Sequence, residues 1–567
     1  MPVTNSDIAA QLGQLAQLLR SQGANRFKVK AYRAAAEAIQ NHPQRLSAVI
    51  AEGKPLPKIP GVGASIAAAI NEIVESGGLT SVKTLAGKLP PGTAEIAHTA
   101  GLSIREAKQL ATTLGVTTAT QLRERLESED IPSTLGRRLV YKARQGLHNA
   151  KRLLWSDANE LAAHYQTALE AVKGIDRIET AGSLRRGKET VGTIRLVIRT
   201  TAPGAARSLR ALLRRHEGIE SLHNDSAVRT TCKLAAGPLL VVRTASAVDF
   251  GAALVEETGS LAHLQSVQAL AAPGRQSARN PAATEKAWYA ARGLPLIPPE
   301  LREGRGEVEA ALAGQLPVLV ELGDIRGDLH AHTTSSDGAN TIEEMAAAAQ
   351  ARGYEYLAIT DHSKSLKITD GLDEKRLRRQ MASIDRLNAK LPTSATFRVL
   401  KGSEVDILED GALDFDDSLL RELDIVIASI HSRFALEKAD QTRRLLRAIE
   451  NPYVTCIGHL TGRKLLKRPG YELDVERVLK AVKRNRKLLE INASPDRLDV
   501  DDDLARRARE LGIPLLVNTD AHSIRELDFM PFGIRQARRG WQSRDTVVNT
   551  RRLPELLRVL AATRRKG

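Results

Sequence analysis

The spacing of apolar residues divides the chain into parts of different character. Apolar positions recur at helical spacing in residues 6–20 and 27–39, and residues 4–150 contain few strand signals, so short helices are predicted there. Residues 150–320 contain strand-like runs, such as IRLVIRT and GPLLVVRT, between helical segments. This alternation predicts an α/β region, and the chain as a whole is predicted to be a multidomain α and α/β protein.

A third pattern begins at Gly323 and continues to about Trp541. Short apolar strands recur at intervals of about 30 residues, with helical segments between them. Seven such repeats predict a distorted (β/α)7 barrel of parallel strands. The strands end in polar or ionisable residues, at His330, His362, Glu404, His431, His459, Asn492 and Asp520. We expect these residues on one rim, because barrels of this kind build their chemistry at the C-terminal ends of the strands.

Length and composition exclude several classes of protein. A chain of 567 residues is too long for one core, and 42% hydrophobic with 26% charged residues is a globular composition. No stretch approaches the ~18 uninterrupted apolar residues of a membrane span. The N-terminal residues lack a signal-peptide pattern, and the two cysteines, Cys232 and Cys456, make no disulfide framework. We therefore expect a cytoplasmic protein with no membrane partner.

The same patterns indicate domain boundaries. We expect a helical region at 1–150, a second domain at 151–293 and a barrel domain at 323–567. The segment LPLIPPELREGRGE (294–307) is rich in proline and glycine, so residues 294–322 are predicted to be a linker.

The charge of the chain points to nucleic acid. The net charge is +16 and the pI is about 9.8, and residues 1–322 carry +11 of that charge against +5 in the remainder. A basic protein without a membrane signal most often binds nucleic acid, so DNA is the expected partner and association with the nucleoid is expected. The arginine-rich composition of proteins from GC-rich genomes is the other explanation.

A turn in the N-terminal part has the form of a DNA-backbone contact. In KIPGVGASIAAAINEIVESG (58–77), a Pro-Gly-Val-Gly turn leads directly into an apolar helix. Glycines allow the backbone to approach a phosphate, and the N-terminus of the helix offers free N–H groups to it. This is the helix-hairpin-helix pattern, so residues 1–150 are predicted to be a DNA-binding region. Gly61, Val62 and Gly63 are its predicted DNA contacts, with Lys30 as a further phosphate contact. A plain turn between two helices is the alternative.

Histidine placement carries the strongest chemical signal. Six of the 13 histidines follow Gly323, and all six lie at or beside the strand ends. His330 and His332 are two residues apart on a strand, so they point to the same side. Three carboxylates join them, and the nine predicted ligands are His330, His332, Asp337, His362, Glu404, His431, His459, Asp520 and His522. Such a set predicts a site for two or three divalent ions, Mn²⁺ or Zn²⁺ or else Fe²⁺. Any one of the nine could instead support a ligand without touching the metal.

Several divalent ions side by side suit the hydrolysis of phosphate esters. One ion generates hydroxide from water at neutral pH, and the others bind phosphoryl oxygens. Glu404, His431 and Asp520 are the predicted catalytic residues. Arg433 and Arg463 follow directly on predicted ligands and are expected to bind the substrate phosphate, whereas a surface salt bridge is the alternative for each.

The barrel motifs resemble those of the PHP (polymerase and histidinol phosphatase) domain. GDLHAHTTSSDG, TDHS, GSEVDI, SIHS, GHLTGR and NTDAHS match its motif series, with all nine ligand positions filled. The resemblance implies three ions. The first would be bound by His330, His332, Glu404 and Asp520, the second by Glu404, His431 and His459, and the third by Asp337, His362 and His522.

The front part resembles a bacterial family X DNA polymerase. FKVKAYRAAAEAI, KIPGVGASIAAAI, AGSLRRGKETVG and FGAAL…TGS stand in the order of that family. The resemblance implies that residues 151–293 form the nucleotidyltransferase-like palm and thumb. Ser183 and Arg186 of the GS-x-RR motif would contact a nucleotide triphosphate in such a polymerase. Here they are expected either to bind a phosphate still or only to hold the fold.

The resemblance breaks at the polymerase active site. The family places two catalytic aspartates in a G-D-I-D segment, which here is Gly192-Thr193-Ile194-Arg195. The third aspartate is expected at Val241, although Asp249 lies nearby. Because nucleotidyl transfer needs carboxylates to hold Mg²⁺ against the triphosphate, Thr193, Arg195 and Val241 predict an inactive polymerase. The alternative is that the third position is misplaced and a residual site survives.

These features together predict a DNA-binding, metal-dependent phosphoesterase. The favoured activity is a 3′→5′ exonuclease or 3′-end-processing enzyme of DNA repair, which binds DNA ends, gaps or damaged sites. One alternative is an active gap-filling polymerase with 3′→5′ exonuclease activity. The other is a PHP phosphatase of small phosphomonoesters. The sequence leaves the metal and the preference for DNA or RNA open.

Overall fold

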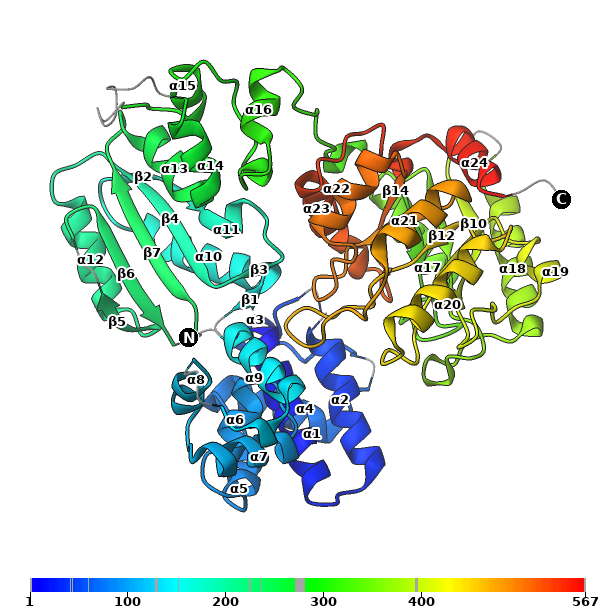
Figure 1. Cartoon of the computed structure of the whole chain (residues 1–567), viewed down its shortest axis with the longest axis horizontal. Coiled ribbons are helices and arrows are strands. Elements are labelled where there is room, and N and C mark those ends of the chain that lie inside the picture. Colours follow the sequence, from blue (N-terminus) through cyan, green and yellow to red (C-terminus); the bar gives the residue numbers. More distant parts are fainter. Residues whose placement is uncertain are drawn as a thin grey trace. The chain divides into compact units, whose positions relative to one another are not determined.

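Figure 1 shows a computed structural model of the chain. The structure describes residues 3–40, 42, 44–59, 61–127, 131–150, 152–223, 226–235, 237–270, 281–392 and 396–564. Pro60 of the predicted hairpin therefore lies outside the described residues. The chain forms two compact units. The first comprises Met1–Ser260 and Val267–Leu296, and the second comprises Leu261–Ser266 and Ile297–Gly567.

The first unit begins with a run of helices, as the apolar spacing predicts. Their bounds are α1 (Asn5–Ser21), α2 (Arg26–Gln40), α3 (Leu46–Ala51), α4 (Ala64–Ser76), α5 (Thr80–Ala86), α6 (Thr93–Thr99), α7 (Ile104–Leu114), α8 (Ala119–Glu127), the 3-10 turn η1 (Ser133–Leu135) and α9 (Arg137–Asn149). Helix α1 starts with a capping box, in which Thr4 and Asp7 each accept a backbone N–H of the other. Ile8, Leu12 and Leu15 of α1 are buried against α2 and α4.

The glycine-containing turn before α4 has the conformation that its sequence predicts. Gly61 has φ +78°, a left-handed conformation that an L side chain rarely adopts. Gly63 is the N-cap residue of α4, and its carbonyl accepts the N–H groups of Ile66 and Ala67. Helix α4 then buries Ile66, Ala69, Ile70 and Ile73, whose spacing forms one helical face. The turn therefore presents the open N-terminus of a well-anchored helix.

The rest of the first unit is α/β. Its elements are β1 (Leu153–Leu154), α10 (Trp155–Glu170), β2 (Ile175–Ala181), α11 (Gly182–Arg185), β3 (Thr190–Val191), β4 (Thr193–Thr200), α12 (Ala205–Arg215), β5 (Ile219–His223), β6 (Arg229–Leu234), β7 (Leu239–Ala245), α13 (Phe250–Thr258), α14 (Leu261–Gln268), of which residues 261–266 belong to the second unit, and α15 (Glu285–Ala290). Five strands form one sheet in the order β2-β4-β7-β6-β5, and only β4 and β7 run parallel. Ile194, Leu196 and Ile198 alternate along β4 and are fully buried.

The second unit is the predicted seven-stranded barrel. Its elements are η2 (Pro299–Leu301), α16 (Glu307–Leu312), η3 (Leu322–Asp324), β8 (Gly327–Ala331), α17 (Ile342–Ala351), β9 (Tyr356–Ile359), η4 (Lys367–Thr369), α18 (Glu374–Lys390), β10 (Arg398–Asp406), α19 (Asp417–Leu420), β11 (Ile425–Ser429), α20 (Lys438–Glu450), β12 (Cys456–Ile457), α21 (Val475–Arg484), β13 (Leu488–Asn492), α22 (Asp502–Leu511), β14 (Leu515–Asn518), η5 (Glu526–Phe529), α23 (Met530–Arg539), η6 (Val548–Thr550) and α24 (Leu553–Ala562). The strands follow one another in chain order from β8 to β14, and every neighbouring pair is parallel.

The barrel is nearly closed, with helices around its strands (Figure 1). A parallel bridge between Ala331 and Ala521 joins β8 to the segment after β14. Every residue of β8, β9, β11, β13 and β14 is buried, as expected when a strand has side chains in the barrel on one face and under helices on the other. All seven strands point the same way, so their C-terminal ends form one rim.

The segment predicted to be a linker is folded for most of its length. Residues 297–322 belong to the second unit, and Leu301 and Val308 are buried there. Glu307 accepts hydrogen bonds from the backbone N–H groups of Gly304 and Arg305 and from His263 Nδ1 at 2.6 Å. Proline and glycine here make tight turns within a packed segment, which composition alone does not distinguish from a free linker.

Within the described residues, no helix combines the length and the apolar character that crossing a membrane requires.

Candidate metal centre

The structure brings the nine predicted ligands together at the C-terminal rim of the barrel. Glu404 lies within β10, and His330 lies within β8. The others stand one to several residues beyond a strand end, because the chain turns outward there and releases its side chains toward the rim. His330, His332, His362, Glu404, His459 and Asp520 are buried, whereas Asp337, His431 and His522 are partly exposed. The cluster thus has a closed floor and one side that is open to solvent.

The buried floor of the cluster consists of His330, His332, Glu404 and Asp520, with Glu404 at its centre. His330 Nε2 lies 3.5 Å from Glu404 Oε2 and 3.5 Å from Asp520 Oδ1. His332 Nε2 lies 3.1 Å from the same Asp520 oxygen. The ligand atoms of His330, His332, Glu404 and Asp520 are all within 4.8 Å of one another, close enough to surround one ion.

Two further groups overlap this one on the open side. His332, Asp337, His362 and His522 form the first, and His362, Glu404 and His431 form the second. Glu404 Oε1 lies 3.2 Å from His431 Nε2 and 2.8 Å from His459 Nε2. These groups differ from the implied ones in two places, because His332 joins Asp337, His362 and His522, and His362 rather than His459 is grouped with Glu404 and His431. Shared members mean that the ions of this centre would be close neighbours.

Burial and mutual charge shift the pKa values of the cluster strongly. Burial opposes protonation of His431, but Glu404 and Asp406 outweigh it and raise the pKa of His431 to about 10. Burial likewise opposes protonation of His522, but the charge of Asp337 outweighs burial and raises the pKa of His522 to about 10. Burial and the neighbouring His522 lower the pKa of His332 to about 4. Burial alone would raise the pKa of Glu404, but His431 and His362 hold it well below its usual range.

Unpartnered buried atoms show that the cluster fits metal ions. Among the described residues, His330 Nε2, His332 Nδ1 and Glu404 Oε2 are buried and have no hydrogen-bond partner. A buried polar atom without a partner is costly, and metal coordination satisfies it. Nitrogen and carboxylate oxygen together are the donor set of Zn²⁺, Mn²⁺ and Fe²⁺ sites. The described residues are therefore able to bind divalent metal ions at this rim.

Two supporting carboxylates, Glu490 and Asp406, were not predicted from the sequence, whereas Asn492 was among the polar strand ends expected at the rim. Glu490 Oε1 accepts a hydrogen bond from His330 Nδ1 at 2.7 Å, and its other oxygen accepts the backbone N–H of His459 at 2.8 Å. Asp406 Oδ1 lies 3.0 Å from His431 Nδ1. Asn492 Nδ2 donates to Asp520 Oδ2 at 3.0 Å, which gives the polar end of β13 a supporting role. Carboxylates of this kind hold an imidazole so that its other nitrogen faces the metal.

The backbone at two of the nine positions is strained. His459 has φ +24° and Asp520 has φ +55°, values that residues other than glycine rarely adopt. Such conformations persist only where surrounding contacts enforce them, and they concentrate at functional sites.

The two predicted phosphate arginines contact other groups. Arg433 Nε lies 3.0 Å from Glu409 Oε2, and its side chain is 64% exposed, which is the salt-bridge alternative. Arg463 Nε donates to the backbone carbonyl of Arg497 at 3.1 Å, and its Nη2 donates to that of Leu498. These contacts do not support the phosphate-binding prediction for either residue.

In the first unit, the predicted polymerase positions lie side by side across two strands. Arg195 of β4 pairs with Val241 of β7, and Thr193 pairs with Leu239. Arg195 Nη1 lies 2.5 Å from Glu257 Oε2, and this buried carboxylate also binds Arg229 at 2.7 Å. The neighbouring Asp249 is not in this row, because it precedes α13 and accepts a hydrogen bond from Ser246 Oγ.

The other predicted contacts of the first unit are placed as follows. Ser183 lies in α11, and Arg186 Nη1 donates to the carbonyl of Thr258 at 2.6 Å. Lys30 is exposed on α2, and Gly61 and Gly63 are exposed at the turn before α4, with Val62 half-buried between them.

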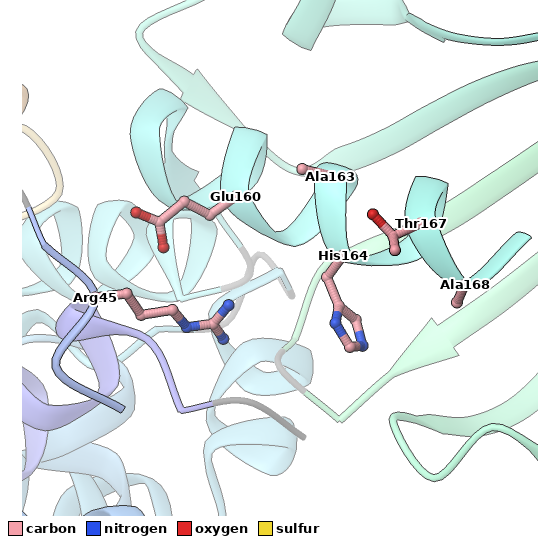
Figure 2. Close-up of a pocket in the computed structure, with 6 residues that line it drawn as sticks. All are labelled: Arg45, Glu160, Ala163, His164, Thr167 and Ala168. Carbon is pink, nitrogen blue, oxygen red and sulfur yellow. The ribbon is translucent and has the colours of Figure 1, made fainter. Parts of the chain in front are cut away.

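A shallow hollow in the first unit lacks the ligands of a metal site. Figure 2 shows it, and its lining residues are Arg45, Glu160, Ala163, His164, Thr167 and Ala168. Burial raises the pKa of Glu160 and lowers that of His164, so both tend toward their neutral forms. One carboxylate and one imidazole are too few for a closed metal site.

A parallel barrel with imidazoles and carboxylates gathered at its rim is an arrangement typical of metal-dependent hydrolases. Residues 328–494 match the PHP domain family, and residues 3–79 match the Helix-hairpin-helix domain family. The whole chain is 35% identical to the DNA polymerase/3′-5′ exonuclease PolX of Bacillus subtilis (strain 168), over 97% of this chain and 98% of that relative. The chain belongs to the bacterial family X DNA polymerases with a C-terminal PHP domain.

The barrel also resembles shorter proteins. It is 32% identical to a probable phosphatase of Thermoanaerobacter sp. (strain X514), over 39% of this chain and 89% of that relative. A probable phosphatase of Photobacterium profundum is 32% identical over 34% of this chain and 77% of its own length.

Proposed function

We propose that this protein is a DNA-binding, metal-dependent phosphodiesterase that removes nucleotides from 3′ ends during DNA repair. The observation that carries the proposal is the nine-residue cluster at the barrel rim, whose buried donor atoms fit divalent metal ions. The similarity to a relative named as a 3′-5′ exonuclease, over nearly the full length of both chains, supports the direction of cleavage.

The proposed metal ligands are the nine residues of the cluster. Mn²⁺ or Zn²⁺, or else Fe²⁺, would be bound there, with Glu404 common to two of the groups. Such ions lower the pKa of a water molecule and stabilise the negative charge that develops on phosphate oxygens.

Neighbouring side chains orient the proposed metal ligands. Glu490 accepts the Nδ1 proton of His330, and Asp406 does the same for His431, so the Nε2 atom of each imidazole faces Glu404. Asn492 holds Asp520 with one oxygen toward His332. The buried floor keeps water away from this side of the cluster, whereas the partly exposed His431, His522 and Asp337 border the side from which a substrate enters.

The front of the chain supports DNA as the substrate. It matches the Helix-hairpin-helix domain family, and the exposed Gly61–Gly63 turn offers backbone N–H groups that suit a phosphate. Residues 1–322 also carry most of the net positive charge. A small phosphomonoester needs no such surface, whereas a DNA end or gap does. This activity would place the protein on chromosomal DNA in the cytoplasm.

The polymerase site is proposed to be lost. The three positions that should carry aspartates hold Thr193, Arg195 and Val241, and the pairing of β4 with β7 supports the assignment of Val241. Arg195 is bound by Glu257, so a cation occupies the place where Mg²⁺ should be held. The palm and thumb at 151–293 would then serve to bind DNA.

A second candidate is a phosphatase of small phosphomonoesters. The observation in its favour is that the barrel alone covers most of the length of relatives named as probable phosphatases.

One experiment distinguishes these functions. Purified full-length protein with Mn²⁺ is incubated with gapped DNA that carries a 5′-labelled primer, with and without dNTPs and Mg²⁺. The proposal predicts a shortened primer and no extension. It predicts the same result for His223→Ala, an exposed histidine of the first unit, and no shortening for the double variant His330→Ala, His332→Ala.

The other outcomes are equally decisive. Extension of the primer would show that the polymerase site is active. An intact primer together with hydrolysis of p-nitrophenyl phosphate would identify a phosphatase and refute the nuclease proposal.

A further inference from the structure

We propose that Arg497 binds the substrate phosphate at the metal centre, and that Arg463 is a positioning residue that holds the Arg497 loop in place. This inference rests on the proposed phosphoesterase function of the same site. It assigns the phosphate contact to a residue that the sequence motifs did not indicate.

Arg497 stands at the rim beside the cluster. It lies in residues 493–501, the loop between β13 and α22, and its Nε is 3.8 Å from Asp520 Oδ2. The side chain is 17% exposed, so most of it is shielded while its end still reaches solvent. Burial alone would lower the pKa of Arg497, but Asp520, Asp496 and Glu404 outweigh burial and raise the pKa above its ordinary value. The guanidinium therefore remains charged at the edge of the metal ligands.

The donors of this guanidinium are not used by the protein. Among the described residues, no hydrogen bond from the Arg497 side chain to another residue is found, and 3.8 Å is too long for one to Asp520. The neighbouring carboxylates have nearer partners. Asp496 pairs with Lys464 at 2.8 Å, and Asp499 accepts Thr461 Oγ1 at 2.9 Å. A planar guanidinium with free donors next to several metal sites matches the geometry of a phosphate, which it can bind through two parallel hydrogen bonds.

The loop is held from the neighbouring strand end. Arg463 Nε and Nη2 donate to the carbonyls of Arg497 and Leu498, and the backbone N–H of Thr461 donates to Asp499 Oδ2 at 3.0 Å. Arg463 and Thr461 follow His459 directly after β12. The segment that carries one predicted metal ligand thus fixes the position of Arg497, which explains why Arg463 is turned toward backbone carbonyls.

The first test measures phosphate binding in the full-length protein. Inorganic phosphate is titrated into Mn²⁺-loaded protein by calorimetry. We expect Arg497→Gln to weaken phosphate binding at least 10-fold. Arg497→Lys should recover part of the affinity, because it restores the positive charge but not the paired N–H donors of the guanidinium. The matched control is Arg507→Gln, which removes a partly exposed arginine of α22 paired with Glu476 and should leave the affinity unchanged. Mn²⁺ stoichiometry and the melting temperature, measured on each variant, identify any variant whose metal centre or fold has failed.

The second test measures hydrolysis with the same variants. We expect kcat/KM for 3′-labelled DNA to fall about 100-fold in Arg497→Gln, the loss typical of a removed charge-stabilising group. Arg463→Gln alone should lower kcat/KM less than Arg497→Gln does. When Arg463→Gln is also present, Arg497→Lys should be no more active than Arg497→Gln, because the loop is then no longer held.

The failures are distinguishable. If wild-type protein degrades DNA and Arg497→Gln binds phosphate and degrades DNA equally well, the inference is wrong and the proposed nuclease stands. If wild-type protein leaves DNA intact but Arg497→Gln still loses phosphate affinity, the nuclease proposal fails and the phosphate site stands. A loss of phosphate affinity in Arg433→Gln with none in Arg497→Gln would assign the contact to Arg433.

Discussion

At the scale of single residues, Glu490 shows how much of the metal centre depends on groups that never touch a metal. Its two oxygens accept the Nδ1 proton of His330 and the backbone N–H of His459, so one carboxylate orients two predicted ligands. Burial alone would raise the pKa of Glu490, but His330 outweighs burial and lowers it, so the carboxylate stays charged. The contribution of Glu490 is therefore electrostatic as well as geometric.

Glu490→Gln should weaken Mn²⁺ binding by about 10- to 100-fold, the usual effect of losing such a supporting carboxylate. The amide keeps the size of the side chain but loses its charge, so His330 becomes a poorer ligand. Isothermal titration of metal-free protein with Mn²⁺ measures the change. Glu476→Gln, at an exposed glutamate of α21, is the matched control and should bind Mn²⁺ as the wild type does. Equal affinities for both variants would contradict the role of Glu490.

At the scale of elements, the Arg497 loop depends on a buried charge. Asp496 is fully buried and pairs with Lys464 at 2.8 Å and with Lys467 at 3.4 Å. Burial alone would raise the pKa of Asp496, but the two lysines outweigh it and lower the pKa below its usual range. A carboxyl group whose pKa is lower in the folded protein stabilises the fold above its unfolded pKa, and this stabilisation is lost as the pH falls toward the folded pKa.

Asp496→Asn should reduce the free energy of unfolding of the barrel at pH 7 by about 3 kcal/mol, the low end of the cost of breaking a buried ion pair. The difference from the wild type should shrink as the pH falls below about 4, where the aspartate of the unfolded chain becomes protonated. Calorimetric unfolding of the full-length protein across this range measures both. Asp440→Asn removes an exposed carboxylate of α20 and should change little. A difference that is independent of pH would show that charge is not the cause.

The turn before α4 provides a second prediction at this scale. Gly61 and Gly77 have φ of +78° and +75°, at the two ends of α4. Alanine at either position costs roughly 1–2 kcal/mol of stability, because L residues disfavour this conformation. Only Gly61→Ala should also weaken DNA binding, since Gly77 lies at the far end of the helix.

Fluorescence anisotropy with a labelled gapped duplex, beside thermal unfolding, compares the two glycine variants. Gly77→Ala is the control, because it should cost the same stability as Gly61→Ala without touching the turn. Equal losses of DNA affinity in both variants would mean that stability alone accounts for the effect, and the turn would not be a phosphate contact.

At the scale of the whole molecule, the chain combines a basic first unit with a barrel that carries the metal cluster. If the first unit binds DNA and the barrel performs hydrolysis, the two functions should be separable by substitution. Electrostatic binding to DNA should also show in its salt dependence, because each neutralised phosphate releases counterions.

Lys30→Glu should weaken DNA binding at every sequence and lower the slope of log affinity against log salt by about 1. Hydrolysis of p-nitrophenyl phosphate by the barrel should remain at the wild-type rate, provided that the barrel accepts this small ester. Lys233→Glu makes the same charge change at another exposed lysine of the first unit, on β6, and should leave the slope unchanged. Identical slopes for both variants would show that Lys30 is not a specific contact.

The sequence by itself determined the class of fold and the inventory of the centre. Seven apolar strands with polar ends are a local pattern, and parallel strands in a barrel necessarily collect those ends on one rim. The positions of six histidines and three carboxylates at or near these strand ends therefore predicted that the nine side chains lie together. The prediction that Thr193 and Arg195 replace catalytic aspartates is equally local, since it depends only on which residue stands at a motif position.

Only the tertiary structure decided which residues support the centre and which arginine faces it. Glu490 lies 160 residues from His330 in the chain, and its position within an apolar strand has no local signature. Arg463 and Arg497 lie 34 residues apart, and each follows a barrel strand, so motif position favoured Arg463. Loop packing reverses that choice, because it turns Arg463 toward backbone carbonyls and leaves Arg497 beside Asp520. The packing of residues 297–322 onto the barrel was hidden for the same reason, since turn-forming residues have the same composition in a linker and in a packed segment.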